Sequence, residues 1–388
     1  MKTGEFGRAL MNLRVETVVG VPDSTLKELC AYLEDGNDFE HICAANEGAA
    51  VGMAAGAYLG TGRPACVYMQ NSGLGNIVNP YTSLAHSDVY GIPMLFVIGW
   101  RGEPGEKDEP QHKFMGRITL DLLRLLEIDY AVLDGSTSPE DLASAAGAAE
   151  KALSANRCFA FVIKKGAFEP YRREAPLLPA GTAFVREDAI AEILKGCGEN
   201  DRIVSTTGKI SREVYEQSDR LSGGHENTFL TVGGMGHASM IAYELAKTRP
   251  DKTVLCLDGD GAALMHLGSA AVIGEHPADN LIHICLNNRA HESVGGMETG
   301  SPSFGFTRFA QLCGYRYTAC ARSVEELREA LACARRKKRL SFIEVRVNRE
   351  SRADLGRPKE SAEENKRLFM NTLKASADPS RIAPKPSF

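Results

Sequence analysis

The sequence predicts an α/β protein of two doubly wound parallel sheets, because apolar strand-like runs alternate with helical stretches in two successive series. The segment from Arg172 to Gly181, which carries Pro176 and Pro179 and few periodic residues, separates the two series. At 388 residues the chain is also long enough to bury the cores of two domains of common size.

Each series contains six runs with the length and composition of buried strands. The expected strands are Thr17–Val21, Glu40–Cys43, Ala65–Met69, Met94–Ile98, Tyr130–Leu133 and Phe159–Ile163, then Arg202–Ser205, Thr228–Leu230, Thr253–Leu257, Leu281–Leu286, Arg316–Ala319 and Phe342–Val347. We expect domains at 1–172 and 184–350, a linker at 173–183 and a C-terminal tail at 351–388. Within the tail, residues 361–374 fit a helix, and the last dozen residues are expected to be disordered.

The composition gives no sign of a nucleic-acid or membrane partner. The 45 basic and 50 acidic residues leave a net charge of −5, and no stretch approaches the length of a membrane span. Residues 1–5 lack the apolar core of a secretory signal, so we expect a cytoplasmic protein. The ten cysteines are scattered without a Cys-x-x-Cys pair, which predicts reduced core residues and neither a disulfide framework nor a zinc site.

Polar residues follow two consecutive strands of the second series. Asp260, within Gly259-Asp260-Gly261, follows one strand, and Asn288 follows the next, with a small-residue helix expected at 262–274 between them. Carboxyl ends of parallel strands share one edge of a sheet, where a magnesium ion could take oxygens from Asp260, Asn288 and the main-chain carbonyl of Ala290. Each half of this pattern is also an ordinary turn sequence.

From about Val18 to about Met370 the chain resembles the thiamine diphosphate-dependent decarboxylases, specifically the short phosphonopyruvate and sulfopyruvate decarboxylase group. The residues that carry the resemblance are Gly20-Val21-Pro22-Asp23-Ser24, Asn46-Glu47-Gly48-Ala49-Ala50, Gln70-Asn71-Ser72-Gly73-Leu74-Gly75-Asn76, Arg101-Gly102-Glu103-Pro104-Gly105, Thr207-Gly208-Lys209, Gly233-Gly234-Met235-Gly236-His237 and the metal motif. The resemblance implies a pyrimidine-binding first domain, a diphosphate- and magnesium-binding second domain, and no middle domain. It also implies at least a homodimer, since in this family the cofactor lies between domains of different subunits.

The resemblance assigns the cofactor contacts. Glu47 would hydrogen-bond the pyrimidine N1′, although read alone it is an acid at a helix N-terminus, favoured by the helix dipole. Met235 would keep the two cofactor rings folded together, although read alone it is a core gap-filler, and the Gly233 carbonyl would accept from the 4′-amino group. The remaining expected contacts are Gly208, Asp260, Gly261, Ala262 and Asn288.

The implied activity is decarboxylation of 3-phosphonopyruvate, an anionic 2-oxo acid, to phosphonoacetaldehyde through a thiamine ylide and an enamine, in phosphonate biosynthesis. The expected catalytic residues are Glu47, Asp23 and His112, and the expected substrate contacts are Asp23, Ser24, Asn71, Ser72, Gln111 and His112. Read alone, Asp23 is a turn residue, Asn71 and Ser72 are caps of a helix starting near Gly73, and His112 is a surface histidine after a long loop. For the phosphonate the candidates are Arg101, Lys107, Lys113, Arg352 and Arg357, each equally readable as a solvated charge.

One position departs from the family pattern. After Asn287-Asn288 relatives commonly carry glycine or another small residue, whereas this chain has Arg289. Arginine there adds strain if the backbone requires a positive φ.

Three other functions remain open. Sulfopyruvate decarboxylase needs the same machinery, and a carboligase would add a second carbonyl compound in place of a proton. A nucleotide-binding or regulatory protein is a further class, but the glycine turns at 73–75 and 233–236 lack the full Gly-x-Gly-x-x-Gly pattern directly after a strand. Retention of Glu47, Asp260 and Asn288 argues against lost catalysis.

Overall fold

The structure is a computed structural model that describes residues 1–36, 38–174 and 182–374. Most of the expected linker and the expected disordered end of the tail lie outside these residues. The chain divides into two compact units. The first comprises Met1–Pro179, Leu264–His266 and Arg289–Phe304, and the second comprises Ala180–Ala263, Leu267–Asn288 and Gly305–Phe388. The expected domain boundaries stay a prediction.

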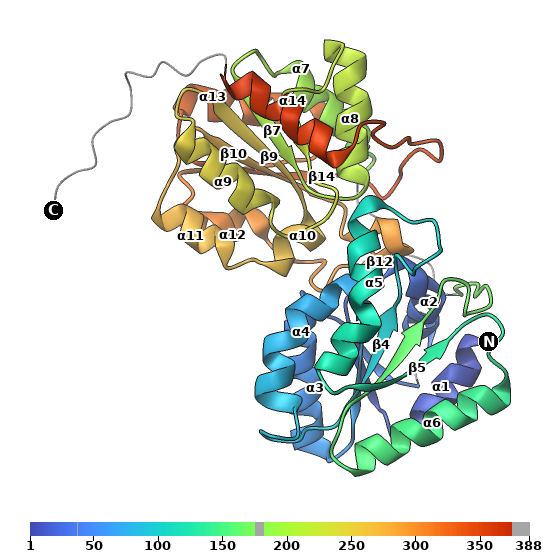
Figure 1. Ribbon diagram of the computed structural model, residues 1–388. Helices are drawn as coiled ribbons and strands as arrows, with labels where there is room; N and C mark the ends of the chain where they lie inside the picture. Colours follow the sequence, from blue (N-terminus) through green and yellow to red (C-terminus); the bar gives the residue numbers. More distant parts are fainter. Residues whose placement is uncertain (37, 175–181, 375–388) are drawn as a thin grey trace. The chain divides into compact units, whose positions relative to one another are not determined.

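The first unit contains a six-stranded, wholly parallel sheet in the order β2-β1-β3-β4-β6-β5 (Figure 1). Its strands are β1 (Thr17–Gly20), β2 (Glu40–Cys43), β3 (Ala65–Gln70), β4 (Met94–Gly99), β5 (Asp129–Leu133) and β6 (Phe159–Ile163). Its helices are α1 (Thr3–Asn12), α2 (Lys27–Asp35), α3 (Glu47–Thr61), α4 (Leu74–Pro80), α5 (Pro110–Leu125) and α6 (Pro139–Ser154), with short turns η1 (Ser24–Leu26), η2 (Asn71–Gly73) and η3 (Tyr81–Ala85).

Helices cover both faces of this sheet because strand residues point alternately to either side. On one face Val18, Cys66 and Phe161 pack with apolar residues of α1, α2 and α6. On the other, Val67 and Phe96 pack with α3, α4 and α5. Figure 1 shows α3 and α4 on the opposite side of the sheet from α1 and α6. The strands are therefore buried on both faces, which explains their almost continuous apolar sequences.

The second unit repeats this topology. Its six parallel strands run in the order β13-β14-β10-β9-β7-β8. Read from the β8 edge, this is the second, first, third, fourth, sixth and fifth strand of the sheet in chain order, which is the same order as in the first sheet. They are β7 (Asp201–Ser205), β8 (Thr228–Leu230), β9 (Thr253–Gly259), β10 (Leu281–Asn287), β13 (Tyr317–Ala321) and β14 (Ser341–Arg346). The helices are α7 (Arg186–Lys195), α8 (Lys209–Ser222), α9 (Ala238–Thr248), α10 (Asp260–Met265), α11 (Ser269–Glu275), α12 (Phe306–Leu312), α13 (Val324–Lys337) and α14 (Ala362–Lys374).

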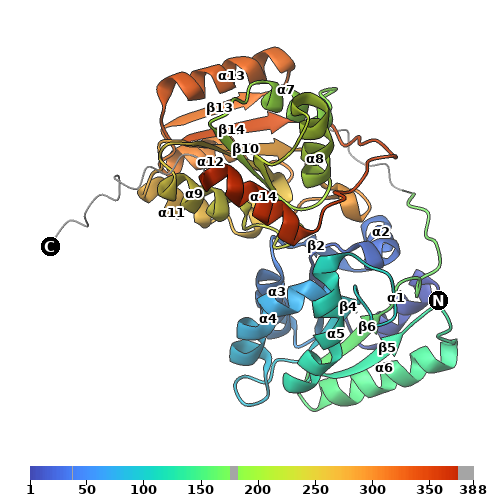
Figure 2. The same ribbon diagram turned by 45° about the horizontal axis from the view of Figure 1, so that its top comes forward.

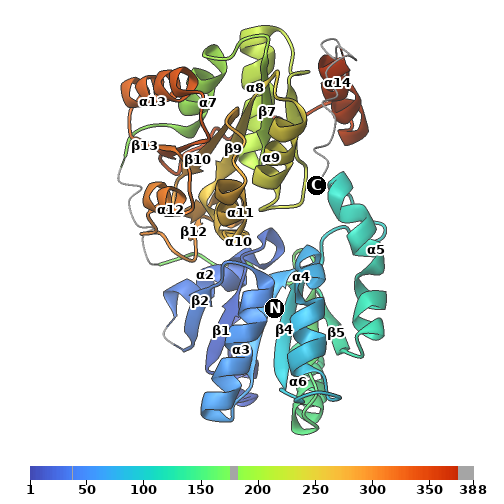
Figure 3. The same cartoon turned by 90° about the vertical axis from the view of Figure 1, so that its left-hand side faces the viewer.

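One face of the second sheet packs Leu255, Ile284 and Ile343 against apolar residues of α7, α8 and α13. Figure 2 shows α13 beside β13 and β14, and Figure 3 shows β7, β9 and β10 side by side. Helices α9 and α12 contact the sheet strands from the other side. A hairpin of β11 (Ala290–His291), η4 (Glu292–Val294) and β12 (Met297–Glu298) follows β10 and is counted with the first unit.

All twelve expected strands and both doubly wound sheets are confirmed, with ends within two residues of prediction. The single helix expected at 262–274 is wrong, because α10 ends at Met265 and α11 begins at Ser269. Gly268 caps the second helix, and a glycine there lowers the helix propensity of the junction. The ten cysteines are free thiols. The expected core position is confirmed for Cys30, Cys66, Cys158, Cys256 and Cys285, whereas four others are only partly buried and Cys320 is exposed. Among the described residues, no helix has the length and hydropathy needed to cross a bilayer.

Candidate active site

Glu47 opens α3 with a buried carboxyl group. Asn46 caps the helix, its side-chain oxygen accepting from the Ala49 N–H at 2.8 Å, and this fixes the first turn. Glu47 is only 5% exposed, and Oε2 accepts a hydrogen bond from Asn76 Nδ2 at 2.7 Å. A Cβ on Gly73 would lie 2.5 Å from Glu47 Oε1, so the carboxyl group occupies space that only glycine leaves free.

These contacts distinguish the two interpretations of Glu47, as a solvated helix N-terminal acid or as a ligand-binding group. A surface acid at a helix N-terminus gains a few tenths of a kcal/mol from the dipole, up to roughly 1 kcal/mol, and stays solvated. Glu47 is instead enclosed and held by a side chain from α4. Burial of a carboxyl group is costly without such partners, so the arrangement favours a group that is held in place for a ligand.

Asp23 is the most enclosed acid of the first unit and belongs to the turn after β1. Its Oδ1 accepts from the Thr25 N–H at 2.8 Å and caps η1, while no described group donates to Oδ2. Burial raises the pKa of Asp23 to about 6, against the hydrogen bond from Thr25 and the charge of Arg101. A Cβ on Gly99 would lie 2.2 Å from Oδ1, so the end of β4 makes room for this carboxyl.

Arg101 links the residues of this cluster. Its Nε donates to Asp108 Oδ2 at 2.7 Å, Nη2 donates to Asp108 Oδ1, and Nη1 donates to Ser24 Oγ at 2.8 Å. Although burial opposes ionisation, the guanidinium and the N–H groups of Glu109 and Gly102 hold the pKa of Asp108 well below its usual range. Asp108 is thus an ionised partner that fixes the plane of the guanidinium.

Asn71 is fully buried, and its amide is used within the first unit. Nδ2 donates to the Arg101 carbonyl at 2.8 Å and to Thr119 Oγ1 at 2.9 Å, and Oδ1 accepts from the Arg101 N–H at 3.2 Å. These contacts tie η2 to the loop after β4. Ser72 is exposed, and its hydroxyl accepts from Gln70 Nε2 at 2.6 Å. The expected helix near Gly73 starts at Leu74, as α4.

His112 and Gln111 lie in the first turn of α5 and not on a surface loop. Burial, and next the charge of Arg101, lowers the pKa of His112 from its usual value and so favours the neutral ring. Gln111 Oε1 is buried, and no described group donates to it. Gly102 has φ of 69°, and a Cβ there would lie 2.0 Å from the His112 carbonyl, so the loop and α5 meet closely. Asp23, Ser24, Asn71 and His112 are therefore all neighbours of Arg101.

In the second unit Asp260 and Asn288 lie at the ends of adjacent strands. β9 ends at Gly259 and β10 at Asn287, and the register pairs Leu286 with Gly259. Both side chains are buried, at 3% and 4% exposure. Buried carboxylate and amide oxygens at one sheet edge fit the donor preferences of Mg²⁺. Ala290 is counted with the first unit, so its place among the ligands stays a prediction.

Asp258, two residues before Asp260, belongs to a buried polar network. Asp258 Oδ1 accepts from the Gly259 N–H at 2.9 Å, and Asp258 Oδ2 lies 3.4 Å from His283 Nε2. His283 Nδ1 is 3.1 Å from the Tyr315 hydroxyl. Together with Cys256, Asp258 and His283 form a cluster of potential metal ligands within the described residues, on strands β9 and β10.

The turn after Asn288 is strained. Arg289 has φ of 60°, in the left-handed region, which a glycine would adopt at no steric cost. Arg349, beyond β14, donates from Nε to the Asn288 carbonyl at 3.3 Å. This contact and the hairpin that follows hold the turn. The backbone at Arg289 therefore has the positive φ for which strain was expected.

The glycine turns of the second unit have the expected conformations. Gly208 has φ of 94° and precedes α8, and Gly234 and Gly236 flank Met235 with φ of 65° and 87°. Met235 is half-buried, and Gly233 precedes this turn. Gly261 and Ala262 form the first turn of α10, with Ala262 buried. All these segments follow the carboxyl ends of β7, β8 and β9.

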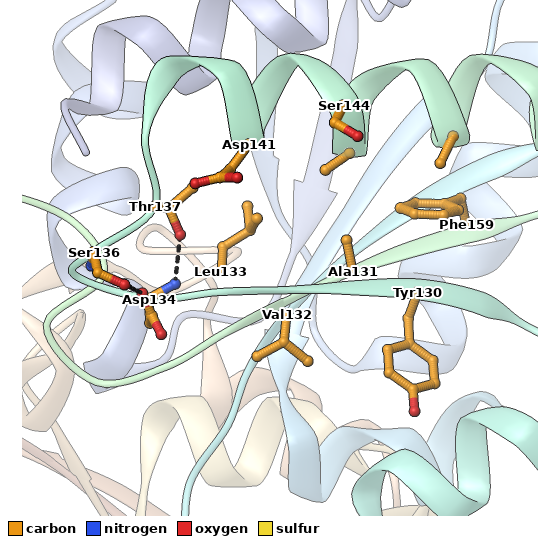
Figure 4. A pocket seen from close by; sticks show the side chains of 12 residues that line it. Tyr130, Ala131, Val132, Leu133, Asp134, Ser136, Thr137, Asp141, Ser144 and Phe159 are labelled. Carbon is orange, nitrogen blue, oxygen red and sulfur yellow. Dashed lines mark hydrogen bonds between the residues drawn. The ribbon is translucent and has the colours of Figure 1, made fainter.

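A pocket of about 450 Å³ in the first unit lies away from these residues, along edge strand β5 and helix α6. Figure 4 shows Tyr130, Leu133, Thr137, Asp141 and Ser144 around it. It contains none of the expected site residues.

Sequence reasoning missed three of the residues that hold the site: Asp108, Asn76 and Asp258. Asn76 belongs to the motif at 70–76, but no periodic pattern encodes its contact from α4 with Glu47, 29 positions away. Asp108 reaches Arg101, 7 positions away, through loop geometry. Asp258 stands two residues before Asp260, and that proximity was the only available signal.

Comparison with known families identifies the class. The thiamine pyrophosphate enzyme N-terminal TPP binding domain matches residues 5–123, and the thiamine pyrophosphate enzyme C-terminal TPP binding domain matches residues 207–345. The chain therefore belongs to the thiamine diphosphate-dependent enzymes, and it is a decarboxylase of that family.

The group expected from the motifs is confirmed by individual relatives. The chain is 37% identical to phosphonopyruvate decarboxylases of Streptomyces viridochromogenes and Streptomyces hygroscopicus, over 93% of this chain and 92% and 91% of theirs. It is 29% identical to sulfopyruvate decarboxylase of Methanosarcina acetivorans, over 85% of this chain and 87% of that one.

Proposed function

We propose that the protein catalyses non-oxidative decarboxylation of 3-phosphonopyruvate to phosphonoacetaldehyde and carbon dioxide in phosphonate biosynthesis. The supporting observation is its 37% identity to phosphonopyruvate decarboxylases over 93% of the chain, against 29% over 85% of the chain for the sulfopyruvate decarboxylase of Methanosarcina acetivorans. Sulfopyruvate decarboxylase subunits reach 42% identity, but over only about a third of the chain. In this reaction the bond from C2 to the carboxylate breaks and a proton replaces the carbon dioxide that leaves. The carbon–phosphorus bond is kept.

Thiamine diphosphate, when bound, accepts the electron pair released as the carboxylate leaves. The chain's contribution is to hold and orient it. Glu47, buried and held by Asn76, would hold a proton at the pyrimidine N1′, the Gly233 carbonyl would accept from the 4′-amino group, and Met235 would pack against the rings. Gly208, Gly261 and Ala262 line the diphosphate.

Magnesium is the second proposed cofactor. Asp260 and Asn288 supply side-chain oxygens from neighbouring strand ends, and the Ala290 main-chain carbonyl supplies a third. The strained turn at Arg289 brings the chain from one of these ligands to the next.

Asp23 and His112 are the proposed groups for proton transfer to the substrate carbon. Asp23 keeps its proton up to about pH 6, and Oδ2 is the oxygen with no described donor. Burial, and next the charge of Arg101, lowers the pKa of His112, which favours the neutral ring, and a neutral ring donates a hydrogen bond without adding a positive charge beside Arg101. Ser24, Asn71, Ser72 and Gln111 are the neighbouring candidates for substrate contact, with Asn71 positioning the loop of Arg101.

We also propose that residues 1–172 bind the pyrimidine, that residues 184–350 bind the diphosphate, and that the active protein is at least a homodimer in the cytoplasm. Family architecture supports these assignments, because relatives bind the cofactor between domains of different subunits. Analytical ultracentrifugation of the protein with cofactor tests the dimer directly.

The substrate is tested by supplying purified protein with thiamine diphosphate, Mg²⁺ and one 2-oxo acid at a time. We expect carbon dioxide and phosphonoacetaldehyde from phosphonopyruvate, with a higher kcat/KM than for sulfopyruvate. Faster turnover of sulfopyruvate would overturn the choice of substrate. Product analysis with an added aldehyde separates simple decarboxylation from carboligation, for which a coupled hydroxyketone would appear.

A further inference from the structure

Five cationic residues are candidates for the substrate's anionic tail, and the structure distinguishes among them. Lys107 and Lys113 are exposed, on the loop after β4 and on α5. Arg352 forms ion pairs with Glu187, Glu216 and Asp354 at the surface of the second unit, and Arg357 is exposed there. Arg101 is half-buried and contacts the loop that carries Asp23 and Ser24.

Arg101 is also preorganised to bind an anion. A guanidinium has five N–H donors, and three are used by Asp108 and Ser24. One N–H remains on each terminal nitrogen, and no described residue accepts from either. Asp108 holds the group in a fixed plane, so little side-chain entropy remains to be lost when an oxyanion with two suitably spaced oxygens binds.

Two further atoms mark this neighbourhood as a place for a ligand. Asp23 Oδ2 and Gln111 Oε1 are buried without a described hydrogen-bond donor. Asp23 precedes Ser24, which Arg101 contacts, and Gln111 lies in the first turn of α5. Buried polar atoms without partners are rare in native proteins, and a bound ligand or water satisfies them.

Extending the decarboxylase function proposed above, we propose that Arg101 binds the phosphonate tail of the substrate and that Asp108 is the positioning residue that aims it. The substrate carboxylate is a poorer partner for this cation. An ion pair to the leaving carboxylate stabilises charge in the ground state that the reaction then removes, whereas a pair to the tail persists unchanged through the transition state. Arg101 thereby sets specificity for tail-bearing 2-oxo acids.

The test compares Arg101→Met with Lys107→Met, which removes the same charge from an exposed position of the same loop. The substrates are phosphonopyruvate and pyruvate, which lacks the tail. We expect Arg101→Met to lower kcat/KM for phosphonopyruvate by about 100-fold or more, as for truncation of a buried charge partner, and to lower kcat/KM for pyruvate by a much smaller factor, so that the ratio of the two falls. Lys107→Met should change neither by more than about threefold.

A binding measurement keeps the test decisive if pyruvate turnover is too slow to measure. Methylphosphonate, titrated calorimetrically into the enzyme loaded with thiamine diphosphate and Mg²⁺, should bind wild type and Lys107→Met but not Arg101→Met. Asp108→Asn should raise KM for phosphonopyruvate more than it lowers kcat. Arg101→Lys, which keeps the charge, covers the case in which the methionine variant does not fold and should recover only part of the affinity.

Three results would overturn the assignment of Arg101. The first is an equal loss of kcat/KM on both substrates in Arg101→Met, and the second is undiminished binding of methylphosphonate by Arg101→Met and Arg101→Lys. The third is a loss of kcat/KM in Lys107→Met comparable to that in Arg101→Met. Wild-type protein that does not decarboxylate phosphonopyruvate at all would instead refute the proposed function, so the two failures are distinguishable.

Discussion

The buried carboxyl of Asp23 predicts a pH-dependent stability that Asp23→Asn should remove. Its pKa is raised from 3.8 to about 6, chiefly by burial. Because the folded state binds this proton more tightly than the unfolded chain, the contribution to stability is complete below pH 3.8 and is lost as the pH rises to about 6. At about 1.4 kcal/mol for each pKa unit, the loss is about 3 kcal/mol in all, roughly half of it between pH 5 and 7.

The assay is urea unfolding of wild type and Asp23→Asn at pH 5 to 8, followed by fluorescence. Trp100, the one tryptophan of the chain, lies buried after β4 in the first unit and reports on the unfolding of that unit. The asparagine amide leaves a buried donor unpaired, which costs about 1–3 kcal/mol at every pH, so the informative quantity is the change of the difference with pH.

The free energy of unfolding of the variant, relative to wild type, should rise by about 1.5 kcal/mol between pH 5 and 7 and then stay constant. Asp88→Asn is the control, because its side chain is 87% exposed and its removal involves no buried charge. A difference for Asp23→Asn that does not vary with pH, or that equals the control's variation, would refute the reasoning.

Three further predictions follow from the site geometry. Gly73→Ala places a Cβ against the end of the Glu47 side chain, so the fold should persist while Glu47 shifts. In a fluorescence titration the affinity for thiamine diphosphate should then fall about tenfold or more, as for loss of one hydrogen bond to a charged group. The control is Gly75→Ala, whose Cβ meets nothing within 4 Å and which should bind the cofactor normally. Glu47→Gln should abolish carbon dioxide release while leaving Mg²⁺-dependent cofactor binding largely intact, and unchanged turnover would dismiss its proposed role. Arg289→Gly should raise or preserve stability, by up to about 1 kcal/mol in thermal unfolding, whereas Arg289→Val should lower it; the reverse order would show that the positive φ is not strained.

Much of the fold was predictable because parallel strands buried on both faces leave nearly continuous apolar runs in the sequence. The strand at Leu281–Asn287 is an example, and its end placed Asn288 correctly beside the end of β9. The break between α10 and α11 was not predictable from the small-residue pattern. Gly274, near the other end of α11, packs so closely on the Cys313 carbonyl that a Cβ would lie 1.7 Å away, so a tertiary contact constrains where α11 lies.

The candidate site was predictable where chemistry follows a strand end, and less so where a side chain reaches across loops. Glu47 was predicted from its motif, and its role stays a prediction, but its hydrogen bond from Asn76 and the space left by Gly73 are visible only in the structure. Asn71 looked equally suited to the substrate or to a helix cap, and its partners proved to be the Arg101 backbone and Thr119, 30 and 48 residues away. Contacts of this kind are set by how loops meet and not by local spacing.

We propose that the buried oxygens of Asp260 and Asn288, after β9 and β10, hold a magnesium ion that in turn binds thiamine diphosphate. Calorimetric titration of the purified protein with thiamine diphosphate, with Mg²⁺ and then with a chelator, measures this directly. We predict saturable uptake with Mg²⁺ that is lost in the chelator, and in the Asp260→Ala variant even with Mg²⁺. Absence of uptake by wild type, or equal uptake by wild type with and without the metal, would contradict the account.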